Sequence, residues 1–138
     1  MPNNAPIYSR VGDIQWNTTA MTAANTTIDL TAGTSYLIFT ADSTAGGYVQ
    51  KIRFRSLGTN VATVARVWIT NATGPGSAAN ATLFDEASLI ASTVSQTGAL
   101  AVTEIPINLA LPPSYKLYIT LGTAVAAGYD AIVVGGKY

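Results

Sequence analysis

Cysteine and histidine are both absent from this 138-residue sequence. Without cysteine the chain has no disulfide, no thiolate nucleophile and no cysteine-based zinc site. Without histidine it has neither the side chain most often used as a catalytic base nor a histidine ligand for a metal ion. Together the two absences exclude Ser-His-Asp and Cys-His catalysis and the metal sites that depend on either residue.

Charged residues are scarce as well, at 10% of the sequence against about 25% in an average globular protein. The seven basic and seven acidic residues cancel, so no global field steers nucleic acid or anionic lipid toward the chain. We therefore expect no nucleic-acid partner. Low charge also removes the repulsion that keeps monomers apart, which favours assembly.

Long apolar runs are missing too, since none reaches the roughly 18 residues that a membrane-spanning helix needs. The start M-P-N-N-A-P-I-Y has neither the positive nor the apolar region of a secretory signal. We expect a chain that is made in the cytoplasm and that has no membrane partner.

What the sequence does contain is a series of short β-rich runs separated by clusters of glycine, asparagine, proline and serine. The runs cover residues 13–16, 26–30, 35–41, 48–55, 61–70, 82–89, 102–109, 116–121 and 129–134. Their spacing indicates an all-β domain, an antiparallel sandwich or barrel of about eight strands with almost no helix. We expect an N-terminal arm over residues 1–12 and one β-domain over 13–138.

The seven carboxylates are the remaining candidates for acid or base chemistry, and two of them could in principle form the pair of a glycoside hydrolase. A sandwich of this length implies no deep cleft for such a pair. Asp85 and Glu86 are adjacent, so on a strand they face opposite sides and cannot both ligate one calcium ion. We expect a protein that is not an enzyme and uses neither a cofactor nor a metal ion.

Basic residues are concentrated in the run G-Y-V-Q-K-I-R-F-R-S-L-G-T-N at 47–60. On a strand, Lys51, Arg53 and Arg55 share one face, and the two apolar residues between them share the other. The apolar face predicts core, whereas the basic face is either wet or covered by a partner that supplies carboxylates. Alternatively, the chain pairs part of this face with its own acids, Glu104 and Asp85 or Glu86.

The next run, at 61–70, raises the question of where Trp68 lies. If the two runs form a hairpin with a five-residue loop, Trp68 lies in the core. A six-residue loop or a bulge turns Val67 and Ile69 inward and adds Arg66 and Trp68 to the basic face. We favour the second arrangement, because it avoids burying Arg66 unpaired. The predicted partner interface consists of Lys51, Arg53, Arg55, Arg66 and Trp68.

Aromatic residues suggest a second function, since seven tyrosines and two tryptophans on a β-domain could form a platform for sugar rings. Most of them lie in positions that favour other roles. We expect core positions for Tyr36, Phe39, Phe54 and Phe84, and strand-edge or interface positions for Tyr48, Tyr115 and Tyr129.

Three segments resemble a family of small structural proteins of tailed bacteriophages, the capsid cement or decoration proteins. The segments are K-I-R-F-R-S-L-G-T-N-V-A-T-V-A-R-V-W-I-T-N, T-L-F-D-E-A-S-L and L-P-P-S-Y-K-L-Y-I-T-L-G-T-A-V-A-A-G-Y-D-A-I-V-V-G-G-K-Y. The resemblance extends from Tyr48 to Tyr138 and is less distinct over residues 1–46.

The resemblance implies a jelly-roll-like sandwich, a homo-oligomer in the form of a trimer, and a place on the outer capsid surface of the virion. It implies the major capsid protein as partner, with no cofactor and no catalysis. The alternative is a carbohydrate-binding or adhesion β-sandwich of a phage tail or surface.

Overall fold

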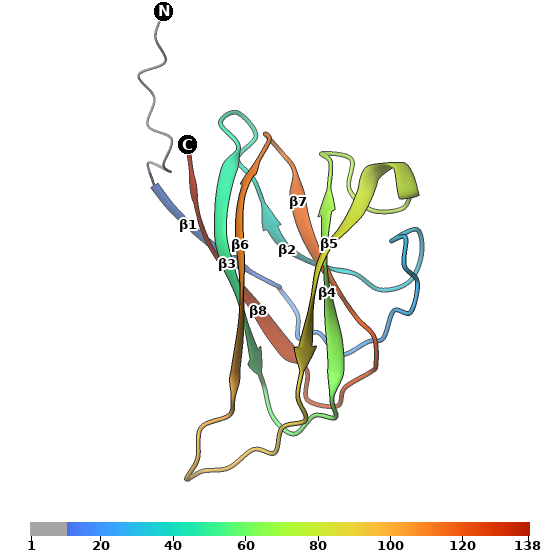
Figure 1. Cartoon of the computed structure of the whole chain (residues 1–138), viewed down its shortest axis with the longest axis vertical. Coiled ribbons are helices and arrows are strands. Elements are labelled where there is room, and N and C mark those ends of the chain that lie inside the picture. The colour runs from blue at the N-terminus through green and yellow to red at the C-terminus, as the bar shows by residue number, and fades with distance from the viewer. Residues whose placement is uncertain (1–10) are drawn as a thin grey trace, which may run out of the picture.

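Two four-stranded antiparallel sheets pack face to face in the computed structural model, which describes residues 11–138 (Figure 1). The strands are β1 (Val11–Trp16), β2 (Tyr36–Thr40), β3 (Gly47–Ser56), β4 (Thr63–Thr70), β5 (Ala81–Leu89), β6 (Val102–Leu111), β7 (Lys116–Leu121) and β8 (Tyr129–Lys137). One short 3₁₀ turn, η1 (Ala78–Asn80), is the helical element of the described residues. The predictions of an all-β sandwich, of about eight strands and of almost no helix are confirmed.

The strand order is β1-β8-β3-β6 in the first sheet, called sheet A here, and β2-β7-β4-β5 in the second, sheet B. Most consecutive strands therefore lie in opposite sheets, which is the arrangement of a jelly roll. β3 pairs with β6 and β8 in sheet A, while β4 pairs with β5 and β7 in sheet B. The expected hairpin between β3 and β4 is wrong, because the connecting residues cross from one sheet to the other.

Alternating apolar residues of both sheets fill the space between them. Large side chains of this core come from β2, β3 and β7 and are almost fully buried: Phe39, Phe54, Ile52, Leu117 and Ile119. Full burial of each stabilises the fold by about 1.5 to 3 kcal/mol. The core therefore rests on the period-two pattern of the sequence.

Two aromatic predictions are wrong. Phe84 is 40% exposed because Ala87 and Leu89 of the same strand face the core, and alternation along β5 then turns Phe84 outward. Tyr129 is buried instead of lying in an interface, and its hydroxyl donates to the Ile90 carbonyl at 3.1 Å. The loop contact of Tyr129 is not visible in the alternation of a single run.

The run at 26–30 forms a loop instead of the expected strand. Asn25 is buried, and its amide donates to the Ala32 and Thr34 carbonyls at 3.0 and 3.1 Å. Leu30 has a left-handed backbone conformation, with φ of 55°. These bonds close the segment on itself, and a strand cannot form across it.

β1 begins at Val11, so Val11 and Gly12 belong to the sandwich and not to the predicted arm. The rest of that arm, residues 1–10, lies outside the described residues. β1 is joined to β2 of the other sheet by Gln15, whose amide donates to the Thr40 carbonyl and accepts from the Thr40 N–H, both at 2.9 Å. Gln15 thus turns inward and fixes which residues of β1 face outward.

Candidate functional site

The outer face of sheet A carries the basic residues of β3. Lys51, Arg53 and Arg55 lie outside, while Ile52 and Phe54 between them are buried in the core. The predicted separation of the two faces of this strand is confirmed, and it follows from strand alternation alone.

Glu104 lies on β6 directly opposite Arg53 and serves two of these cations. One carboxylate oxygen is 3.2 Å from Lys51 Nζ, and the other is 3.6 Å from an Arg53 guanidinium nitrogen. All three side chains are largely exposed, so each pair contributes only about 0 to 1 kcal/mol to stability. The intramolecular pairing considered for Glu104 therefore exists, but the fold does not depend on it.

Arg55 has a different environment. Its guanidinium donates to the Leu100 carbonyl at 3.5 Å, and its strand partner on β8 is Asp130. The Asp130 carboxylate accepts a hydrogen bond from the Asn17 amide at 3.1 Å. Three cations with one shared carboxylate in ion-pair range leave this side of sheet A net positive.

Arg66 lies on the outer side of sheet B and not with the other basic residues. Its Nε donates to Glu86 at 2.9 Å on the neighbouring strand β5. The prediction that Arg66 shares the basic face of β3 is wrong, because β4 belongs to the opposite sheet. Arg66 therefore cannot belong to one continuous face with the β3 residues, and the pairing of Glu86 with the β3 face is excluded by the same topology.

Trp68 points to the same side as Arg66 but is only 1% exposed. Its indole N–H donates to the Thr120 hydroxyl at 3.0 Å. Val67 turns into the core and Ile69 packs against it, as the favoured arrangement predicts. Trp68 itself has no accessible surface to offer a partner, because the chain covers it and satisfies its one donor.

The exposed aromatic residue on sheet A is Trp16, which the interface prediction did not include. Trp16 and Ile14 lie on the edge strand β1 and are 61% and 59% exposed. Their partners on β8 are Ile132 and Val134, which in turn lie beside Arg53 and Lys51 of β3. An apolar half, formed by these four residues of β1 and β8, thus adjoins the basic half of the same face.

The sequence holds one signal of this arrangement. Ile14 and Trp16 stand two residues apart, which places them on one face of any strand. Alternation does not reveal that β1 pairs with β8. Trp16 and its partner Ile132 are 116 positions apart in the sequence. The juxtaposition of apolar and basic residues is therefore a product of the topology.

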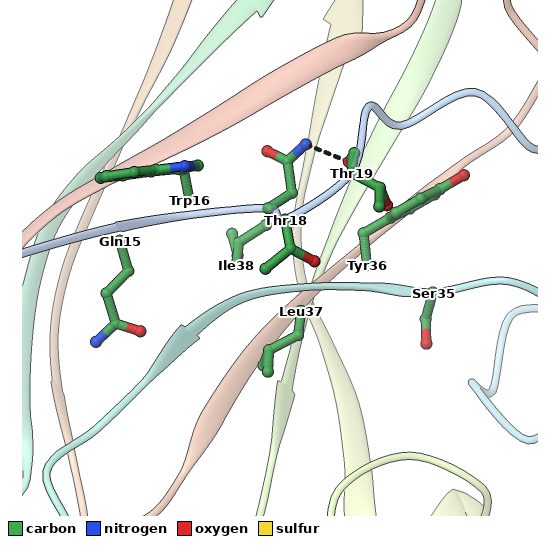
Figure 2. A pocket seen from close by; sticks show the side chains of 9 residues that line it. Gln15, Trp16, Thr18, Thr19, Ser35, Tyr36, Leu37 and Ile38 are labelled. Carbon is green, nitrogen blue, oxygen red and sulfur yellow. Dashed lines mark hydrogen bonds between the residues drawn. The ribbon is translucent and has the colours of Figure 1, made fainter.

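A hollow of about 270 Å³ lies between the end of β1 and β2 (Figure 2). Figure 2 shows the Trp16 and Tyr36 rings well apart, with Thr18 between them. The Asn17 amide donates to the Thr19 carbonyl at 2.7 Å. Asn17 is buried, and its amide also bonds with β8, so it serves the fold. Thr18, Thr19 and Ser35 contribute hydroxyls to the lining of the hollow.

Two features of the described residues bear on chemistry. Within residues 11–138 no three acidic side chains come together to hold a metal ion, and every buried side-chain nitrogen and oxygen has a hydrogen-bond partner. No helix of this part of the chain is long and apolar enough to span a membrane. The candidate sites of the described residues are therefore the outer surfaces and the hollow beside Trp16.

No protein-family model matches the sequence, and no curated protein matches it. Dimeric latent PorU from Porphyromonas gingivalis is similar over 96% of this chain, with 8% identity and a TM-score of 0.38. The structure of infectious bursal disease virus, Gt strain, is similar over 91% of it, with 18% identity and a TM-score of 0.29. This chain spans 14% and 32% of those two chains. Similarity at this level assigns neither a family nor a function.

Proposed function

We propose that the chain is a non-enzymatic structural protein of a tailed-phage virion, a cement or decoration protein that binds and stabilises the outer capsid surface. The observation that carries the proposal is the outer face of sheet A, where exposed Trp16 and Ile14 adjoin a net positive ladder. The resemblance of residues 48–138 to that family supplies the major capsid protein as the partner.

The two halves of this face complement each other in a protein interface. Tryptophan and arginine are the residues that most often carry binding energy, because they bury a large area and make directed hydrogen bonds. Arg53 and Arg55 are free to bond with partner carboxylates, since Glu104 is held by an exposed and weak pair. The matching surface is one with an apolar patch beside one or more carboxylates.

The test is cosedimentation of the full chain with capsids of the phage that encodes it. For Trp16→Ala we expect a loss of at least 2 kcal/mol, about 30-fold in affinity. For Arg53→Ala we expect a loss of roughly 2 to 5 kcal/mol, because a partner carboxylate is left buried without its charge. The melting temperature of the isolated protein stays near that of the wild type, since both side chains are exposed.

Arg66→Ala is the matched control, because Arg66 is also paired with a glutamate but lies on the other sheet. We expect its capsid affinity to equal that of the wild type. Wild-type affinity in both the Trp16 and the Arg53 variant would rule out the outer face of sheet A as the contact.

Carbohydrate binding is the second candidate, and the exposed Trp16 beside a hollow lined by hydroxyls favours it. An indole face can stack on a sugar ring while neighbouring hydroxyls bond to it. A glycan array separates the two functions. Saturable binding of a sugar that Trp16→Ala removes and Arg53→Ala retains would favour the adhesion module.

A further inference from the structure

Three loops at one end of the sandwich are bonded into a single unit, called the tip here and formed by residues 57–62, 90–101 and 122–128. Figure 1 shows them together at the end away from the C-terminus. The Asn60 and Ser92 backbones exchange two hydrogen bonds, at 3.0 and 2.9 Å. The Leu57 N–H donates to the Gly128 carbonyl at 3.0 Å, which joins the third loop.

Asn60 holds the same loops through its side chain. Its amide nitrogen donates to the Ser56 hydroxyl and to the Gly128 carbonyl, both at 2.9 Å. Its amide oxygen accepts from the Ala127 and Gly128 N–H groups at 2.8 and 2.9 Å. A buried side chain with four bonds fixes the tip before any partner binds, which lowers the entropic cost of association.

The surface of the tip is apolar and without charge. None of its three segments contains an ionisable residue. Four large aliphatic side chains on two of the loops are 48% to 63% exposed: Leu57, Val61, Ile90 and Val94. Rigid, uncharged and apolar loops match the core of a protein interface, where charged residues are depleted.

We infer that the tip is the surface through which copies of this chain associate into a closed symmetric oligomer. The distribution of charge indicates both the partner, a second copy of the chain, and the surface through which the copies meet. The outer face of sheet A is net positive, so two copies that met there would repel. Two tips can meet without burying a charge of their own. Their identical apolar patches then pack against each other about a symmetry axis.

The size of the tip agrees with this role. Its three segments comprise about 25 residues, within the roughly 20 to 30 per partner of a standard interface. Trp16 and Arg53 lie on strands outside the tip, whereas Arg55 adjoins the tip through its bond to the Leu100 carbonyl. The inference goes beyond the proposed function and does not depend on what sheet A binds.

Multi-angle light scattering of the full chain over a concentration series tests the inference. We expect the wild type to have a mass of two or more times the 14.3 kDa of one chain. Ile90→Lys and Val61→Lys each place a charge in the apolar contact. We expect these variants to associate at least about tenfold more weakly and to dissociate to monomers. Because both side chains are exposed, the melting temperature measured on the monomer shows whether the fold is retained.

Ile28→Lys adds the same charge at an equally exposed isoleucine outside the tip and is expected to keep the wild-type mass. Trp16→Ala is expected to keep it as well, which separates self-association from capsid binding. A wild type that stays monomeric throughout the series would overturn the inference. Tip variants that keep the oligomeric mass would overturn it too. If such variants lost capsid binding instead, the tip would be a capsid contact and not the surface of self-association.

Discussion

Asn60 shows how one side chain determines the shape of a surface far larger than itself. It is buried, and its side chain makes three hydrogen bonds to Ala127 and Gly128 of the tip and one to Ser56 at the end of β3. Replacing it by alanine leaves the Ala127 and Gly128 N–H groups without their acceptor, whereas the Gly128 carbonyl keeps its bond from the Leu57 N–H. Each such group costs about 1 to 3 kcal/mol, and part of the loss is recovered by water.

We therefore expect Asn60→Ala to lower the free energy of unfolding by roughly 2 to 4 kcal/mol and the melting temperature by about 10 °C. Differential scanning calorimetry measures both. Gln96→Ala is the control, because Gln96 is an exposed amide of the same tip. Equal melting temperatures for the two variants would mean that Asn60 does not hold the loops.

At the residue scale the sequence predicted side-chain direction better than side-chain environment. The outward placement of Lys51, Arg53 and Arg55 followed from alternation and is confirmed. Trp68 also points away from the core, yet it is buried with its N–H bonded to Thr120. Alternation determines the side of a sheet, and it cannot say whether other parts of the chain cover that side.

At the scale of elements, close approach between β3 and β8 depends on Gly135. A Cβ atom at this position would meet the Tyr48 backbone carbonyl, which belongs to the paired strand and cannot move aside alone. Gly12 on β1 has no atom within 4 Å of the same position. Gly135 and Gly12 can therefore be compared directly, because both lie in sheet A and differ in the space available for a side chain.

We expect Gly135→Ala to reduce the free energy of unfolding by roughly 2 to 3 kcal/mol through overpacking. Gly12→Ala should change it by less than about 0.5 kcal/mol in either direction, as is usual for an exposed position. Denaturant titration of both variants gives the comparison. The steric account is wrong if Gly135→Ala unfolds at the wild-type midpoint.

Strand positions were predictable and strand partners were not. Eight of the predicted runs became strands, because each combines β-branched or aromatic residues with turn residues at its ends. The β3–β4 hairpin was wrong because a jelly roll pairs strands that are distant in the sequence. Pro106 is a signal that could have helped, since proline inside a strand indicates an edge, and β6 is an edge strand.

For the molecule as a whole, the three surfaces differ in charge. The outer face of sheet A is net positive with an apolar half, the outer side of sheet B pairs Arg66 with Glu86, and the tip carries no charge. A protein with formal net charge zero can thus contact an acidic partner and its own copies through separate surfaces. Composition predicted assembly, and only the topology shows where the charges gather.

Electron microscopy of the phage particle tests the central claim, that the outer face of sheet A binds the capsid. The account predicts density for the jelly roll on the outer shell, with β1 and β3 toward the capsid and Trp16 and Arg53 in contact with it. Jelly-roll density with this face turned to solvent, or particles that lack the protein altogether, would contradict the account.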